Sequence, residues 1–304
     1  MITYRTMTMD DIPGGLLLCR ANRWNQVARD WEIFLRLSPD NCLVATSQAN
    51  ISNQVIIGSQ TTITSQATIA GTVTTLRYQR FFSWIGMVLV DPSFQRQGIG
   101  MQLLQQAMEI SGEDKTIKLD ATPAGREVYL KLGFVDEYPL SRMHAEAVTG
   151  IWQNDKTRLL QNTRPMQNND LSAIARFDRE IFGANRRPLL EWIRMGAPQY
   201  AFLVEEGHRI QGYCLGRRGH NFIQIGPVVA NDIAIAQDLV TAALANCTGQ
   251  PVILDIPHHD PNWSAWVNSL GFSVQRPFMR MFRGLNTFNC IPELQFAITG
   301  PEFG

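Results

Sequence analysis

The residues with the clearest capacity for chemistry form a short turn, Gln95-Arg-Gln-Gly-Ile-Gly100, in the first half of the chain. Two glycines, Gly98 and Gly100, let the backbone approach a ligand closely, and amides at a helix start have no partner within the helix. A phosphate or diphosphate placed there would meet unpaired N–H groups, the positive end of a helix dipole and the guanidinium of Arg96. The turn therefore predicts an anion site.

Apolar patterning predicts a strand before this turn and a helix after it. Ile85 to Val90 is β-branched and of strand length, and Asp91-Pro92 ends it because proline has no amide proton to donate to a ladder. From Ile99 onward, apolar residues recur at helical spacing and glutamines face the other way. The turn lacks the Lys-Ser/Thr ending of a P-loop and the third glycine of a dinucleotide fingerprint. It is therefore neither of the two common nucleotide loops.

Two motifs resemble those of a known family. Gln95, Gly98 and Gly100 match the pattern Gln/Arg-x-x-Gly-x-Gly/Ala, and Tyr129 to Phe134 matches Tyr-x-x-x-Gly-Phe. In both, the chain resembles the GNAT acetyltransferase superfamily. The resemblance implies that an acetyl group passes from acetyl-CoA, a cosubstrate, directly to an amine, and no metal is expected. It assigns the cofactor to the backbone of Val88, Leu89 and Val90 and to the turn residues Gln95, Arg96, Gln97, Gly98, Ile99 and Gly100.

The same resemblance implies that Tyr129 is the acid that protonates the departing thiolate. The alternative is a tyrosine that packs with its hydroxyl in water. The chain departs from the family just before this residue, where it has Asp120-Ala-Thr-Pro-Ala-Gly125 in place of an asparagine and a longer run. The base is not identified: Asp120, at the end of its predicted strand, is one candidate, and water alone is another. Asp91 is interpreted as a turn residue and Glu127 as a solvated charge.

The acceptor is expected to be the primary amine of a small molecule or a peptide. Trp24 and Asn25 are candidates for its site, because the resemblance places the loop between the first two helices beside the acetyl end of the cofactor. Trp31 is interpreted as a core residue, since it shares helical spacing with Phe34 and Leu35. His258-His259-Asp260 is interpreted as a surface loop, because adjacent histidines point in different directions and no third metal ligand is suitably spaced.

The second half of the chain repeats the first. Arg5 to Asp11 lines up with Arg164 to Asp170 at a shift of 159 positions (164 against 5). Leu132-Gly-Phe134 also reappears, as Leu270-Gly-Phe272, at a shift of 138 (270 against 132). The same shift of 138 relates Pro139, Arg142 and Met143 to Pro277, Arg280 and Met281. These identities indicate a duplication.

The strand and helix pattern around the turn predicts an α/β fold. The family resemblance, together with the repeat, implies a mixed sheet and two tandem GNAT-like domains. We expect a catalytic domain at 1–145, a linker at 146–162 and a degenerate domain at 163–304. In the first domain the polar stretch 47–75 is expected to hold a hairpin. Later segments predict a strand at 116–119, a helix at 124–132 and one or two strands at 134–143.

The second half is expected to have lost the chemistry. Its central strand, Phe222 to Ala230, leads into Asn231-Asp232, with no glycine pair and no arginine. Asp232 at that helix start would cap the amides itself and repel a phosphate. Val267 stands where the first half has Tyr129. A second acetyl-CoA site is therefore not expected.

Composition narrows the remaining function classes. The 304 residues carry 27 basic and 27 acidic side chains, so neither nucleic acid nor an anionic membrane is an expected partner. No signal peptide or membrane span is evident, and five scattered cysteines suggest reduced thiols and a cytoplasmic location. Two alternatives to an N-acetyltransferase remain: a non-catalytic protein that binds and senses acyl-CoA, and a scaffold.

Overall fold

The computed structural model describes residues 1–47, 52–57, 60–65, 68–79, 81–112, 116–148, 163–286 and 290–304. The chain divides into two compact units, which we call unit 1 and unit 2. Unit 1 comprises Met1–Leu76 and Ile85–Gly112, and unit 2 comprises Arg77–Trp84 and Glu113–Gly304. Strand β6 (Phe82–Val90) therefore begins in unit 2 and ends in unit 1. The predicted linker, 146–162, lies almost wholly outside the described residues.

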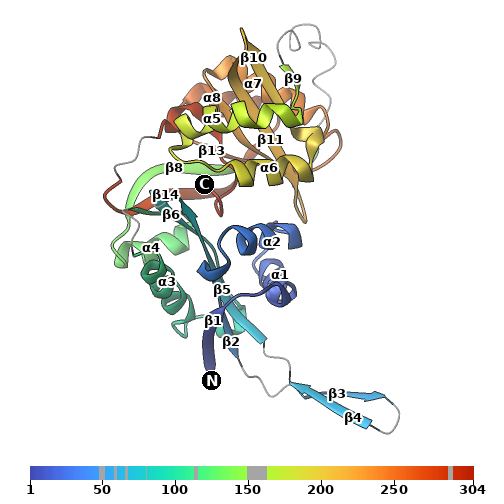
Figure 1. Ribbon diagram of the computed structural model, residues 1–304, viewed down its shortest axis with the longest axis vertical. Coiled ribbons are helices and arrows are strands. Elements are labelled where there is room, and N and C mark those ends of the chain that lie inside the picture. The colour runs from blue at the N-terminus through green and yellow to red at the C-terminus, as the bar shows by residue number, and fades with distance from the viewer. Residues whose placement is uncertain are drawn as a thin grey trace. The chain divides into compact units, whose positions relative to one another are not determined.

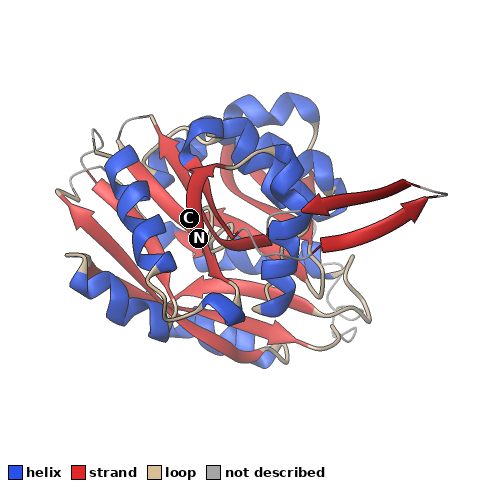
Figure 2. Cartoon of the chain, turned by 90° about the horizontal axis from the view of Figure 1, so that it is seen from below, coloured by secondary structure: helices blue, strands red, loops and turns tan. Residues whose placement is uncertain are grey.

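Unit 1 is a sheet with helices, in the strand order β1-β2-β5-β6. Its elements are β1 (Ile2–Thr6), α1 (Ile12–Ala21), α2 (Ala28–Leu37), β2 (Cys42–Ser47), β5 (Thr68–Tyr78), the end of β6 and α3 (Ile99–Ile110) (Figure 1). Strands β3 (Ser52–Ile57) and β4 (Gln60–Ser65) pair with each other as a separate hairpin, as the polar stretch predicted (Figure 2). Strand β5 follows at Thr68, and residues 48–51, 58–59 and 66–67 of that stretch lie outside the described residues.

The helices of unit 1 follow their apolar stripes. Trp31, Phe34 and Leu35 on α2 are all buried, so the interpretation of Trp31 as a core residue is confirmed. The carboxylate of Asp30 accepts the amide of Val27 at 2.7 Å and thereby caps the helix start. On α3 the buried stripe consists of Ile99, Leu103, Leu104 and Ala107.

Unit 2 contains the rest of the chain (Figure 1). Its strands are the start of β6, β7 (Thr116–Ala121), β8 (Val135–Ala145), β9 (Thr163–Pro165), β10 (Phe202–Glu206), β11 (Arg209–Arg218), β12 (Ile223–Ala230), β13 (Val252–Pro257), β14 (Ser273–Gly284) and β15 (Gln295–Ala297). Its helices are α4 (Pro123–Lys131), α5 (Leu171–Phe182), α6 (Arg187–Gly196), α7 (Ile233–Leu244) and α8 (Pro261–Ser269). The strand order is β6-β7-β14-β8-β13-β12-β11-β10-β9, and β15 pairs with β12.

The sheet is mixed, as predicted, because β6 pairs with β7 and β12 with β13 in parallel, whereas β8 pairs with β13, and β14 with β7, in antiparallel ladders. The long strands β8 and β14 are exchanged between the two repeats. Strand β14 of the second repeat lies between β7 and β8 of the first, and β8 lies between β14 and β13. Such an exchange ties the repeats together through continuous backbone ladders.

Two buried ion pairs follow from the exchange. Arg280 on β14 faces Asp120 on β7, and both carboxylate oxygens accept its N–H groups, at 2.8 and 2.9 Å. Arg142 on β8 makes the equivalent pair with Asp255 on β13, with both distances 2.8 Å. Arg142 and Arg280 are the arginines related by the repeat of 138 positions. Each repeat thus contributes an arginine to an aspartate of the other.

The start of each repeat also carries a matching ion pair. Arg5 pairs with Asp11 at 2.7 Å in unit 1, and Arg164 pairs with Asp170 at 2.8 Å in unit 2. The carboxylate of Asp11 accepts the amide of Thr8 at 2.8 Å, so it caps the short turn before α1 and not α1 itself. These pairs join the residues that the shift of 159 positions relates, in agreement with a duplication.

Candidate functional site

The turn before α3 has the geometry of an anion site. Gly98 is the residue before the helix and has a left-handed φ of 81°, and Arg96 also has a positive φ, of 61°. The first intrahelical hydrogen bond runs from the amide of Gln102 to the carbonyl of Gly98 at 3.0 Å. The three preceding helix amides, at Ile99, Gly100 and Met101, are therefore available for an acceptor. No side chain among the described residues caps this helix start.

The two glycines of the turn serve different purposes. A Cβ at Gly98 would meet nothing within 4 Å, so glycine is favoured there by its left-handed backbone and the space stays open to a ligand. A Cβ at Gly100 would lie 3.3 Å from Cγ2 of Val90, so this glycine lets α3 start close to β6. Gln95, Arg96 and Gln97 are exposed. The turn thus presents a positive, uncapped surface to solvent.

The strand residues that are predicted to bind the cofactor lie at the end of β6. Leu89 is buried, whereas Val88 and Val90 are partly exposed. The carbonyl of Met87, a residue with φ 51°, accepts the hydroxyl of Thr72 at 2.9 Å. Asp91 accepts the amide of Ser93 at 2.8 Å, which confirms its interpretation as a turn residue.

The loop between α1 and α2 is held by an arginine from α1. Arg20 donates to the carbonyl of Trp24 at 2.7 Å and to that of Gln26. Trp24 is partly exposed, and Asn25 has only 3% of its surface exposed. Their assignment to an acceptor site stays a prediction.

Tyr129 lies on α4 and is partly buried. Its ring centroid is 5.9 Å from that of Phe134, and a Cβ on Gly125 would come within 3.0 Å of its Cε2. Burial raises the pKa of Tyr129 to about 12, so the phenol is protonated at neutral pH. Among the described residues, no group forms a hydrogen bond with its hydroxyl. The geometry therefore leaves this proton available for donation.

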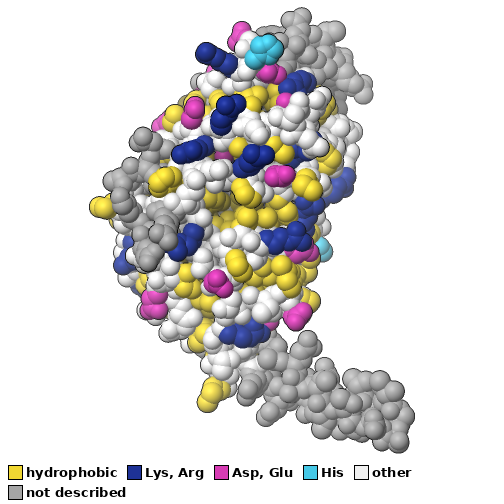
Figure 3. Space-filling view, viewed as in Figure 1, with side chains coloured by type: hydrophobic (Ala, Val, Ile, Leu, Met, Phe, Trp, Pro, Cys, Tyr) yellow, Lys and Arg dark blue, Asp and Glu magenta, His cyan; other side chains and the backbone are white. Residues whose placement is uncertain are grey.

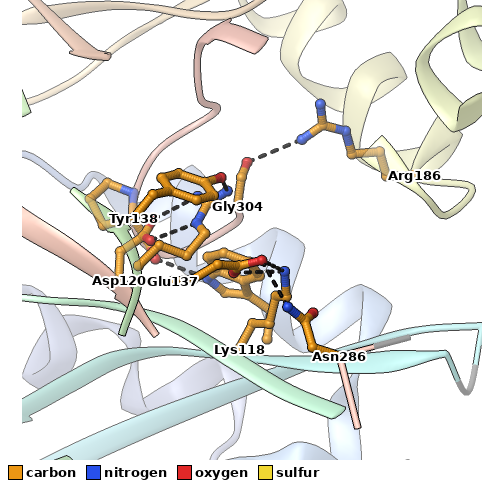
Figure 4. Close-up of polar contacts among 10 residues, drawn as sticks. Lys118, Asp120, Glu137, Tyr138, Arg186, Asn286 and Gly304 are labelled. Carbon is orange, nitrogen blue, oxygen red and sulfur yellow. Dashed lines mark hydrogen bonds and ion pairs between the residues drawn. The ribbon is translucent and has the colours of Figure 1, made fainter. Parts of the chain in front are cut away.

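Asp120 lies within β7, one residue before its end, with its carboxylate buried and paired to Arg280. Arg280 also donates to the hydroxyl of Tyr138 at 2.5 Å, and its guanidinium lies 4.6 Å from the Trp84 ring centroid. Figure 4 shows Asp120 and Tyr138 close together. Burial raises the pKa of Asp120, and the charge of Arg280 opposes that rise. Both oxygens already accept N–H groups, which favours a structural role over that of a base.

A second polar cluster, centred on Lys118 of the same strand, was not predicted. Nζ of Lys118 lies 2.8 Å from both carboxylate oxygens of Glu137, and Asn286 donates to one of them at 3.0 Å (Figure 4). Burial lowers the pKa of Lys118, and the Glu137 carboxylate opposes that effect. Lys118 and Asp120 alternate with apolar residues in β7, and this spacing could have shown that they share one face of the sheet.

The equivalent helix start in the second half is closed, as predicted. The side chain of Asp232 accepts the amide of Ile235 at 2.8 Å and so caps α7. Of the histidine pair, His258 is exposed, whereas the His259 ring centroid lies 4.4 Å from that of Tyr138. Among the described residues, no three His, Cys, Asp or Glu side chains are grouped so as to hold a metal. None of the described helices has the length and apolar character needed to span a membrane.

Comparison with known proteins identifies the family. Models of the acetyltransferase (GNAT) domain match residues 41–136 and, separately, residues 174–297. The chain belongs to the GNAT acetyltransferase family. It contains one GNAT match in each half, so it is a tandem GNAT protein, and its family and relatives support acyl transfer. On the face shown in Figure 3, basic and acidic side chains of this GNAT protein are interspersed.

Individual relatives agree with this assignment. Holothin acyltransferase of Pseudoalteromonas sp. is 26% identical over 214 residues, which is 70% of each protein. A putative acetyltransferase from Pyrococcus horikoshii aligns over 100% of this chain and 96% of its own, with a TM-score of 0.76 and 23% identity. A tandem GNAT protein from the clavulanic acid biosynthesis pathway aligns over 93% and 98%, with a TM-score of 0.59 and 12% identity. Both solved structures therefore share the fold of this chain along nearly its whole length.

Proposed function

We propose that this GNAT protein transfers the acetyl group of acetyl-CoA to a primary amine by direct attack on the thioester. The observation that carries the proposal is the uncapped start of α3, where the amides of Ile99, Gly100 and Met101 precede the first intrahelical bond. Backbone amides at a helix start, with the helix dipole behind them, suit a diphosphate. The exposed guanidinium of Arg96 adds a positive charge at the same turn.

Acetyl-CoA would supply an acyl group activated as a thioester. The backbone of Val88, Leu89 and Val90 orients and polarises that group by hydrogen bonds. Tyr129 donates the proton that the departing thiolate requires, because its raised pKa keeps the phenol protonated at neutral pH. Trp24 and Asn25 are proposed to contact the acceptor.

Water is the proposed base for the acceptor amine. Asp120, the candidate from the sequence, is held through both oxygens by Arg280. A proton accepted there would weaken a buried ion pair, which opposes the transfer. The name of the relative from Pseudoalteromonas sp., Holothin acyltransferase, makes holothin the first acceptor to test.

The test is release of free thiol from acetyl-CoA in the presence of a panel of amines, with the variant Gly98→Glu. A carboxylate at this turn repels the diphosphate, so we expect kcat/KM to fall by roughly 100-fold or more. Gly249→Glu is the matched control, because Gly249 also has a left-handed φ, of 72°, and a Cβ added to it would meet nothing within 4 Å. Turnover that survives Gly98→Glu as well as it survives Gly249→Glu would refute the proposal.

A second candidate is a non-catalytic protein that senses acyl-CoA. The pairing of Asp120 with Arg280 favours it, because this pairing occupies the candidate base. The same preparation distinguishes the two functions. Saturable CoA binding in calorimetry without thiol release from any amine would support the sensor, whereas turnover with one amine would exclude it.

A further inference from the structure

In the second half of the chain, β12 and β13 pair over only two residues, and a short strand from the C-terminal segment, β15, lies beside β12 where that pairing ends. Strand β12 pairs with β13 in parallel at Ile223 and Gln224. Further along, β15 takes over as its partner, with Val228 opposite Ala297 and Val229 opposite Gln295. The amide of Ile298, just after β15, donates to the carbonyl of Asp255 on β13 at 2.9 Å. The segment therefore bridges β12 and β13 where their own ladder ends.

Strand β12, beside which β15 lies, corresponds to β6, the strand that is proposed to hold the cofactor in the first half. Phe222, Ile225, Gly226 and Val228 repeat Phe82, Ile85, Gly86 and Val88 at a shift of 140 positions (222 against 82). Val228 and Val229, which pair with β15, thus correspond to Val88 and Leu89. Strand β6 also pairs with β7 in parallel at two residues, Ser83 and Trp84.

Side chains of the second half hold β15 in place. The indole of Trp263 donates to the carbonyl of Phe296 at 2.8 Å, and the two ring centroids lie 5.0 Å apart. Trp263 stands where the first half has Gly125, at the shift of 138 positions (263 against 125). A Cβ on Gly226 would lie 2.1 Å from the carbonyl oxygen of Ile298, so only glycine allows this close approach.

We propose that Gln295–Ile298 is a built-in replacement for the pantetheine arm of acyl-CoA in the second half. The segment adds its backbone to β12 as an extra strand, as an extended ligand would. The carboxylate of Asp232 takes the place of the diphosphate at the start of α7. The chain therefore holds one acyl-CoA. This inference depends on the proposed function, which places acyl-CoA along Val88 to Val90.

The anchored segment continues to the start of β6, within unit 2. The carbonyl of Pro301 accepts the indole N–H of Trp84 at 2.9 Å, and that of Phe303 accepts the hydroxyl of Tyr78 at 2.7 Å. Arg186 donates to the carbonyl of Gly304 at 3.1 Å (Figure 4). The filled groove thus anchors the segment that supports Trp84 and Tyr78. This gives the second half a structural task in place of a cofactor.

Calorimetric titration of the full chain with CoA tests the stoichiometry. We expect one CoA per chain in the unmodified protein, none in Gly98→Glu and one in Gly249→Glu. Two CoA per chain, or one retained by Gly98→Glu, would overturn the inference. Binding of no CoA by the unmodified chain would instead refute the proposed function. In that case, hydrogen exchange still tests separately whether 295–298 stays paired with β12.

Hydrogen exchange of peptides covering 226–230 and 295–298 tests the occupant directly. We expect slow exchange in the free protein and no change at saturating CoA. Exchange in 295–298 that is fast, or that accelerates when CoA is added, would show that the segment does not stay paired with β12. Trp263→Phe keeps an aromatic ring but loses the donor to Phe296, so it should accelerate exchange of 295–298 by about fivefold. It should leave CoA binding and acyl transfer unchanged. Unaltered exchange in this variant would show that the hydrogen bond from Trp263 to Phe296 does not hold the segment in place.

Discussion

At the scale of single residues, Tyr129 is the group whose chemistry can be tested most cleanly. Its phenol is protonated at neutral pH and forms no hydrogen bond with a described residue, so Tyr129→Phe removes a proton donor and little packing. We expect kcat to fall by about 100-fold with the denaturant midpoint unchanged, as general acid catalysis implies. Tyr200→Phe is the control, because its buried hydroxyl also forms no hydrogen bond with a described residue. Equal kcat values for the two variants would remove Tyr129 from the mechanism.

For Asp120 we expect the opposite: its substitution should have a large effect on stability. Asp120→Asn leaves the charge of Arg280 buried without its partner, so the free energy of unfolding should fall by about 3–5 kcal/mol. Urea unfolding measures this change. Asp136→Asn is the control, since Asp136 pairs with Arg126 in a more exposed setting and its loss should have no measurable effect. A stable Asp120→Asn protein with a shifted pH–rate profile would favour Asp120 as the base instead.

The residues that sequence alone identified are those whose role is local. Asp91 and Asp232 accept amides two and three positions away, and Gly98 adopts the left-handed backbone that such a turn favours. The partner of Asp120 lies 160 positions along the chain, and no local pattern specifies such a distance. A clue was present nonetheless, because Arg280 belongs to the repeat that also contains Arg142.

At the scale of elements, the contrast between α3 and α7 carries the argument. Both helices follow the central strand of a repeat, but α3 starts at an uncapped left-handed glycine and α7 starts at an aspartate that accepts its own helix amide. One start is therefore open to an anion and the other is satisfied internally. The strands differ in the same way: β12 of the second half has β15 as an additional partner, whereas the corresponding end of β6 is proposed to bind the cofactor.

The cap on α7 should matter for stability and not for catalysis. Asp232→Ala removes the acceptor for the amide of Ile235 and should lower the free energy of unfolding by about 1 kcal/mol. Thermal and denaturant unfolding measure the loss, and the thiol-release assay should give an unchanged kcat/KM. A large fall in kcat/KM with full stability would mean that this helix start takes part in the reaction.

Several element bounds could be predicted because they follow from apolar spacing and from prolines. The predicted helix at 124–132 and strand at 116–119 differ by one or two residues from α4 and β7. The exchange of β8 and β14 could not be predicted, because alternation within a strand does not specify its neighbours. Strand β15 has three residues and a pairing that depends on distant backbone, so no periodic signal identifies it.

At the scale of the whole molecule, the buried and partly buried tyrosines predict how the chain responds to alkali. Five of the six tyrosines have a raised pKa, with burial as the main cause. They are Tyr4, Tyr78, Tyr129, Tyr138 and Tyr213. The folded chain keeps protons that the unfolded chain releases near pH 10, so their contribution to stability is complete below about pH 10 and is lost as pH rises further.

Tyrosinate absorbance and urea unfolding, both measured between about pH 8 and pH 12, test this expectation, because that interval spans the usual tyrosine pKa of about 10. The urea midpoint should fall above about pH 10, and most of the absorbance should appear with unfolding and not before it. Gradual ionisation of most tyrosines near pH 10 in the folded chain would show that these side chains are solvated.

The central claim is that amides at the start of α3 bind the diphosphate of coenzyme A. Backbone amide spectra of the ¹⁵N-labelled chain, titrated with CoA and separately with pantetheine, test it most directly, because pantetheine lacks the diphosphate. The account predicts that CoA shifts the amide signals of Ile99, Gly100 and Met101 and that pantetheine leaves them in place. Equal shifts with both ligands, or unchanged signals at saturating CoA, would contradict it.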